Sequence, residues 1–209
     1  VVTEFPRSKK LMKFPRVALG TNASPYSGVG SGSTVSGYTI KASGEYSNST
    51  SFYASRAFSS YPDTWITFNT AYTGATGLPV ANSANVTKFG QEGSWLEIKL
   101  PNKILLNYTQ IFSRPDAPTE RTDTADIWAS NTGNDGDWVK LTTINFNDTY
   151  THIIPMVADI DTQTYYQYFA IQITKIGWGG PYANIGEWEL YGTPEYDPEA
   201  NGVDVVVKS

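Results

Sequence analysis

The sequence predicts an all-β fold, because it shows strand-like alternation, frequent turn-forming residues and no sustained helical period. The clearest alternation lies in residues 95–100, where three aliphatic residues share one face and Trp95, Glu97 and Lys99 share the other. A second segment, residues 169–173, alternates Phe and Ile with Ala and Gln. No stretch of about a dozen residues keeps the 3.6-residue period of a helix. Many short strands of this kind form a sandwich or a barrel, which is the architecture that we expect.

The expected strands are rich in β-branched and aromatic residues, and Gly, Pro, Asn or Asp separate them. Trp65, Trp95 and Trp188 fall within strand patterns and are expected to pack in the core or on a sheet. Residues 130–136 contain Gly and Asn, which tolerate positive φ, and they predict a tight turn with Trp138 packed behind it. In chain order the expected strands cover residues 38–43, 65–69, 95–100, 104–113, 125–130, 138–146, 150–154, 169–173 and 187–191.

The composition excludes several classes of function. The chain has 209 residues with no cysteine and one histidine, His152. It therefore has no thiol nucleophile and no disulfide, and a metal site built from several histidines is impossible within it. No apolar run approaches the roughly 20 residues of a membrane-spanning helix, so membrane insertion is not expected.

The charge divides the chain into an arm and a body. Five Lys and Arg against Glu4 give residues 1–16 a charge of +4, and the net −5 leaves −9 for the remainder. We expect a basic arm or linker at 1–17, a β-sandwich at 18–193 and an acidic linker at 194–209. The arm is either an extended lead-in segment, which we favour, or a tail that binds an acidic partner. A body of −9 argues against a nucleic-acid partner.

Four segments in order resemble the discoidin family, also called coagulation factor V/VIII type C domains. They are Tyr53-Ala-Ser-Arg-Ala-Phe-Ser-Ser-Tyr-Pro-Asp-Thr-Trp65, Gly93-Ser-Trp-Leu-Glu-Ile-Lys-Leu-Pro101, residues 126–138 and residues 168–192. The resemblance implies an all-β jelly-roll β-sandwich that is galactose-binding-domain-like, with a ligand site in loops at one end. Members of that family mostly bind glycans, lipid head groups or proteins.

The two ends of the chain carry a second resemblance. Lys13-Phe-Pro-Arg-Val-Ala near the start and Pro194-Glu-Tyr-Asp-Pro-Glu near the end are similar to discoidin-like modules in structural proteins of large algal DNA viruses. In those proteins further domains follow the module. The resemblance implies a virion-surface or extracellular location, with other virion or surface proteins as partners.

Sugar recognition needs a flat apolar surface and a few fixed polar groups, and the loop at residues 177–184 supplies both. Trp178 lies between glycines there, and Tyr182 and Asn184 follow it. These three residues are candidate ligand contacts. The alternative is that Trp178 folds back over the end of the sandwich and covers the core.

Three further loops match regions near the family's ligand end. Arg114 and Arg121 lie in one of them, where the resemblance implies an arginine that forks onto hydroxyls or a carboxylate. The alternative there is a solvated loop of Arg–carboxylate pairs. Tyr46 and Tyr72 lie in the other two loops and are also candidate ligand contacts.

The resemblance also implies a structural Ca²⁺, for which Asp63, Thr64 and Glu187 stand at the expected ligand positions. Calcium prefers six to eight oxygen ligands, several of them carbonyls. The sequence departs from the family at Ser59 and Ser60, where relatives usually carry an Asp-Gly pair, so a weak or absent site is an equal expectation.

Glycoside hydrolysis and asparagine glycosylation are also conceivable from the sequence, but neither is the function that we expect. Glu187 and Glu189 share one face of a strand at a separation that glycoside hydrolysis could use, but such pairs are routine on exposed sheets, so we expect no enzyme activity. Asparagine glycosylation would require exposed loops. The sequons begin at Asn22, Asn48, Asn85, Asn107 and Asn147.

The sequence therefore favours a non-catalytic, lectin-like carbohydrate-binding module of a larger virion or cell-surface protein, with glycans or a glycoprotein as partner. The alternative is a structural protein–protein assembly module of a viral capsid or fibre, with no glycan ligand. Because one fold supports many functions, this step rests on the resemblance.

Overall fold

The computed structural model describes most of the chain, and strands dominate the described part. Two short 3-10 helices are present, η2 (Thr50–Phe52) and η3 (Ala54–Phe58). In this part of the chain no helix is long and apolar enough to cross a membrane. The described residues are 2–6, 10–19, 32–35, 37–46, 50–59, 63–67, 70–80, 88–114, 121–146, 153–177, 180–196 and 203–207.

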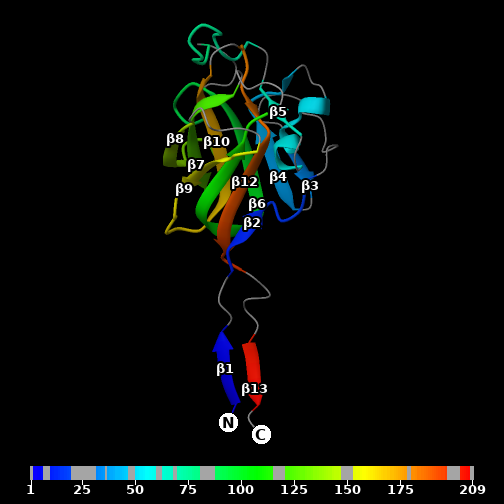
Figure 1. Ribbon diagram of the computed structural model, residues 1–209. Coiled ribbons are helices and arrows are strands. Elements are labelled where there is room, and N and C mark those ends of the chain that lie inside the picture. The colour runs from blue at the N-terminus through cyan, green and yellow to red at the C-terminus, as the bar shows by residue number, and fades with distance from the viewer. Residues whose placement is uncertain are drawn as a thin grey trace.

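Two antiparallel layers form a β-sandwich, and the long strand β6 (Ser94–Phe112) belongs to both (Figure 1). Residues 94–99 of β6 pair with β4 and β10, whereas residues 104–112 pair with β12 and β9, apart from one further pair of Ile104 with Tyr166 of β10. The first layer has the order β3 (Gly32–Val35), β4 (Tyr38–Ala42), β6, β10 (Tyr166–Ile176), β7 (Thr122–Ser130) and β8 (Val139–Asn145). The second layer contains β2 (Met12–Phe14), β12 (Glu187–Pro194), β6 and β9 (Met156–Asp159).

The core between the layers is built from the alternating faces that the sequence predicts. Leu96, Ile98 and Leu100 have no exposed surface. Trp65 and Trp188 are also fully buried, and Trp95 is 4% exposed. Each buried indole N–H of the first two has a partner, since Trp65 donates to the Gly44 carbonyl and Trp188 donates to the Thr109 hydroxyl. The expectation that these tryptophans pack on sheets or in the core is confirmed.

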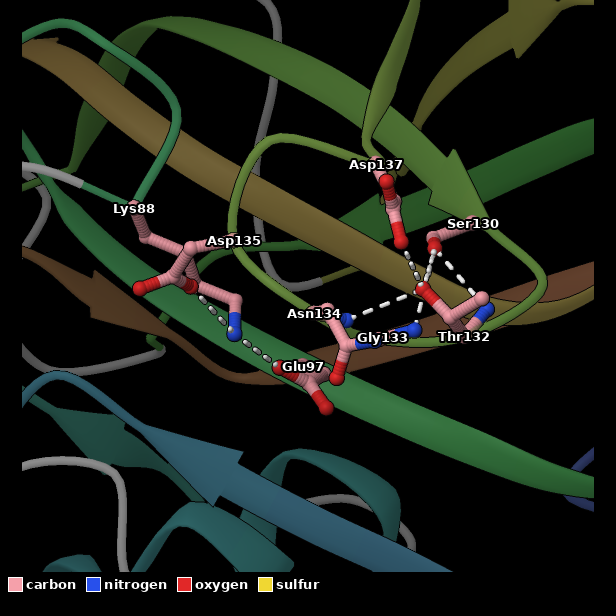
Figure 2. A network of polar contacts seen from close by, with 8 residues as sticks. All are labelled: Lys88, Glu97, Ser130, Thr132, Gly133, Asn134, Asp135 and Asp137. Carbon is pink, nitrogen blue, oxygen red and sulfur yellow. Dashed lines mark hydrogen bonds and ion pairs between the residues drawn. The ribbon is translucent and has the colours of Figure 1, made fainter.

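A second, smaller packed layer covers the outer side of the first sheet. Lys88 lies there with its ammonium 4.9 Å from the Trp95 ring centroid and 5.1 Å from the Trp138 ring centroid. Its Nζ is 2.9 Å from Glu97 Oε2 and 3.7 Å from Asp135 Oδ1 (Figure 2). Glu97 is only 1% exposed, so this ion pair is shielded from water.

The expected turn between β7 and β8 is tied by short polar contacts (Figure 2). The Ser130 hydroxyl accepts from the backbone N–H groups of Thr132 and Gly133. The Thr132 hydroxyl donates to Asp137 at 2.6 Å. Gly133 has a φ of 73° and a Cβ there would lie 2.6 Å from the Tyr168 ring, so a side chain does not fit. Trp138 is 9% exposed behind this turn, as expected.

Two expectations about the strands differ from the structure. The strand expected at 150–154 is wrong in its described part, because Ile153 and Ile154 lie in an exposed bend and β9 begins at Met156. Pro155 lacks a backbone N–H, so the ladder starts only after it. Residues 95–100 and 104–113 were expected as separate strands, but they form the single strand β6, which continues through Pro101.

The basic arm is partly built into the sandwich. Strand β2 pairs with β12, and Phe14 is 5% exposed in the core. Farther out, β1 (Val2–Pro6) pairs antiparallel with β13 (Val203–Val207). Figure 1 shows this two-stranded ribbon standing apart from the sandwich, at the end where β12 finishes.

Candidate ligand-binding site

Four half-buried side chains from distant segments meet at the end of the sandwich away from the ribbon. Tyr46 meets Phe52 edge-on with ring centroids 5.8 Å apart, and it meets Tyr182 at 5.3 Å. The guanidinium carbon of Arg114 lies 5.5 Å from the Phe52 centroid. We call Tyr46, Phe52, Arg114 and Tyr182 the aromatic–arginine cluster.

Backbone hydrogen bonds hold the segment of Tyr182 in place. The Thr67 N–H donates to the Ala183 carbonyl, and the Ala183 N–H donates to the Thr67 hydroxyl, each at 2.9 Å. Next to them, β5 (Trp65–Ile66) pairs with β11 (Asn184–Ile185). These contacts hold the backbone directly after Tyr182 against the segment that follows β5.

The other members of the cluster are anchored as well. The Glu45 carboxylate accepts from the Ala54 N–H at 2.6 Å, which ties the segment of Tyr46 to η3. Arg114 follows β6, and its N–H donates to Asn184 Oδ1 at 3.4 Å. Phe52 lies in η2, one residue before Tyr53.

The cluster has the two properties that sugar recognition requires. Its rings are half-buried, so part of their surface remains open to the apolar C–H face of a sugar. The guanidinium of Arg114 supplies donors that fork onto hydroxyl or carboxylate oxygens. Open ring surface beside guanidinium donors is the combination that sugar recognition uses.

The structure brings together Tyr46, Tyr182 and Arg114 of the predicted contacts. Arg121 lies close by, since it forms a parallel bridge with Asn184. Trp178 lies outside the described residues, so its role stays a prediction. Phe52 was not anticipated, because the sequence shows it only as one apolar residue after a polar loop.

Two of the predicted contacts are structural residues instead. Tyr72 is 2% exposed, and its hydroxyl donates to the Ile173 carbonyl at 2.8 Å and accepts from the Ser94 N–H at 3.0 Å. Burial raises the pKa of the Tyr72 phenol, against the effect of the hydrogen bond from Ser94. Asn184 has no exposed surface, and its carbonyl accepts from the Thr122 hydroxyl. Neither side chain offers a surface to a ligand, which corrects both expectations.

Asp63, one of the predicted calcium ligands, already has protein partners in the structure, and the calcium site stays a prediction. Both oxygens of Asp63 are engaged, one by the Arg56 guanidinium and the other by the Ser59 hydroxyl at 2.6 Å. A cation at this carboxylate would compete directly with the charge of Arg56. Thr64 is 5% exposed and Glu187 is 7% exposed. Among the described residues no three Asp, Glu, His or Cys side chains gather in a possible metal site.

Glu187 and Glu189 line a surface pocket of about 70 Å³, and Lys13 and Phe58 are among the other residues that line it. Lys13 Nζ lies 2.8 Å from one oxygen of Glu189, and the Tyr191 hydroxyl donates to the other at 2.8 Å. Burial and then the Glu189 hydrogen bond raise the pKa of the Tyr191 phenol. Both oxygens of Glu189 therefore have structural partners.

The sheets and loops described above define a galactose-binding-like β-sandwich, the fold that the sequence resemblance implies. No family model matches the sequence, and no curated protein matches it significantly. Solved structures match over most of the chain. One is an F5/8 type C domain from Bacteroides fragilis, with 18% identity and a TM-score of 0.56, covering 78% of this chain and 97% of that one.

Two further matches are carbohydrate-binding modules from Clostridium perfringens. A family 32 module in complex with galactose shows 18% identity and a TM-score of 0.54, covering 75% of this chain and 94% of that one. A second family 32 module, in complex with GalNAc-β-1,3-galactose, shows 15% identity and a TM-score of 0.53 over 74% of this chain and 94% of that one. At these identities the likeness establishes the fold.

Proposed function

We propose that this chain is a non-catalytic carbohydrate-binding module and that the aromatic–arginine cluster is its ligand site. The observation that carries the proposal is the meeting of three half-buried aromatic rings with one guanidinium at a loop end of the sandwich. The fold shared with modules solved in complex with galactose and with GalNAc-β-1,3-galactose supports the same function. Glycans or a glycoprotein would be its partners.

The position of the cluster suits a module that is presented outward. Arg114 follows the end of β6 at Phe112, which pairs with Glu187, the first residue of β12. The ribbon of β1 and β13 follows the opposite end of β12 (Figure 1). A tether at the ribbon would direct the cluster away from the attachment point. We extend the proposal to a module of a larger virion or cell-surface protein, with Trp178 as a further predicted contact.

An assembly module without a glycan ligand is the second candidate. It is favoured by apolar surface near β9, where Ile153 is 74% exposed, Ile154 is 57% exposed and Val157 is 45% exposed. Exposed apolar groups on an edge strand are typical of contact surfaces. No ligand would then require the aromatic–arginine cluster.

A printed glycan array separates the two candidates. We expect the wild-type chain to bind at least one glycan class and Tyr182→Ala to lose that signal. Tyr196→Ala is the matched control, because Tyr196 is a 57% exposed tyrosine beyond the end of β12. An array without any signal for a folded wild-type chain would refute glycan binding and favour assembly.

A further inference from the structure

The ribbon formed by β1 and β13 is a two-stranded sheet, and its two outer edges are open with respect to the other described strands. Its register runs from Val2 opposite Val207 to Pro6 opposite Val203, with Glu4 opposite Val205 at the centre. Among the described residues each of these strands pairs with the other and with no third strand. A two-stranded sheet is marginally stable in water, and an open β-rich edge readily accepts another strand.

The two open edges differ in their capacity for self-pairing. On β1, an antiparallel pair of two copies centred on Glu4 would set the two Glu4 residues opposite each other, and like charges in that position are destabilising. Pro6 in the same strand lacks a backbone N–H. The β1 edge is therefore a poor site for a second copy.

The β13 edge is self-complementary. Its sequence is Val203-Asp-Val-Val-Val207, with four β-branched residues of high strand propensity and no proline. An antiparallel pair of two copies centred on Val205 sets Asp204 opposite Val206, so the two carboxylates do not face each other. A pair with this symmetry is isologous and closes after two copies.

We propose that two copies of this chain associate through their β13 edges, in an antiparallel pair centred on Val205. The resulting sheet has four strands in the order β1, β13, β13 and β1. Its outer edges are the two β1 strands, where Glu4 and Pro6 oppose further growth. If the glycan function holds, the dimer carries two aromatic–arginine clusters, and bivalent binding gains avidity without new contacts.

The oligomeric state of the full chain tests the proposal. Light scattering after size exclusion should give twice the 23.0 kDa of one chain. Val205→Lys should shift the mass to that of a monomer, since two lysines would face each other across the new pair. Within the ribbon the same lysine faces Glu4, which favours β1–β13 pairing, so ribbon loss would not explain the shift.

The matched control is Thr3→Lys, which adds the same charge to β1 and should leave the dimer intact. A wild-type chain that stays monomeric at all accessible concentrations would overturn the proposal. A Val205→Lys chain that remains dimeric would overturn the β13 edge as the interface. An unchanged melting temperature in each variant shows that the sandwich is folded.

Cross-linking gives an independent test, because the chain has no native cysteine. Opposite residues of an antiparallel pair have Cα atoms about 4.5–5.5 Å apart, which is within disulfide range. Val205→Cys should therefore form a covalent dimer under mild oxidation, whereas Thr3→Cys should stay a single chain on a non-reducing gel. The reverse pattern would contradict the proposed edge. Neither result depends on glycan binding.

Discussion

Replacing Lys88 with methionine should strongly destabilise the sandwich. The Lys88 ammonium lies 2.9 Å from Glu97 Oε2 and between the rings of Trp95 and Trp138. Methionine fills much of the same volume but leaves the Glu97 carboxylate at 1% exposure without its counter-charge. Removing one partner of such a buried pair costs about 3–5 kcal/mol, because the remaining charge is not solvated.

This cost can be measured by thermal unfolding. For a domain of this size each kcal/mol lowers the melting temperature by about 2–4 °C, so the expected decrease is about 6–20 °C. Glu97→Gln in the Lys88→Met background removes the uncompensated charge and should recover a large part of the loss. A double-mutant cycle then gives the coupling energy of the pair.

Lys175 supplies a matched control. Its Nζ lies 2.6 Å from Asp123, but the two side chains are 47% and 34% exposed. An exposed pair of this kind is worth about 0–1 kcal/mol, so Lys175→Met should change the melting temperature little. A melting temperature of Lys88→Met close to that of Lys175→Met would contradict the predicted cost of the unpaired Glu97 charge. So would a double variant that is no more stable than Lys88→Met alone.

Three further predictions follow from single residues. The pKa of Tyr72 is raised in the folded chain, so the contribution of this phenol to stability is complete below its unfolded pKa of about 10 and is lost as pH rises above that value. Chemical denaturation from pH 8 to 11 should therefore show a falling free energy of unfolding. Tyr72→Phe should make this fall with pH less steep. Because Arg56 and Ser59 already engage both oxygens of Asp63, we expect EDTA to leave the melting temperature unchanged in calcium-free buffer. A decrease of several degrees would show that calcium is bound. Asn107 lies within β6 and donates to Asp161, so its sequon should stay unmodified in the folded chain when glycopeptides are mapped by mass spectrometry.

The strands that the sequence predicted well are those in which aliphatic residues recur at every second position. In β6 and β12 the period of two follows directly from the pleat, so the residues themselves identify the buried side. The same pattern cannot tell what covers the other side. Glu97 was expected on the face opposite the aliphatic residues, and the structure buries it under Lys88, a residue from a segment without strand alternation.

The candidate site was harder to predict because three separate regions of the chain build it. Arg114, Tyr46 and Tyr182 were named one loop at a time, and their contact depends on pairings that no local pattern encodes. Phe52 gave no distinctive signal. Tyr72 lies between Ala71 and Thr73 outside any alternating run, so its burial against the carbonyl of Ile173 could not be anticipated.

The assignment of the ligand site can be tested by calorimetric titration of the folded chain. The ligands are galactose, GalNAc-β-1,3-galactose and the best array glycan. We expect measurable binding by wild type and by Tyr196→Ala. Arg114→Ala and Tyr182→Ala should each bind about tenfold or more weakly, the effect of losing about 1.4 kcal/mol of contact energy. Binding that is unaffected by both substitutions would contradict the assignment of the site to the aromatic–arginine cluster.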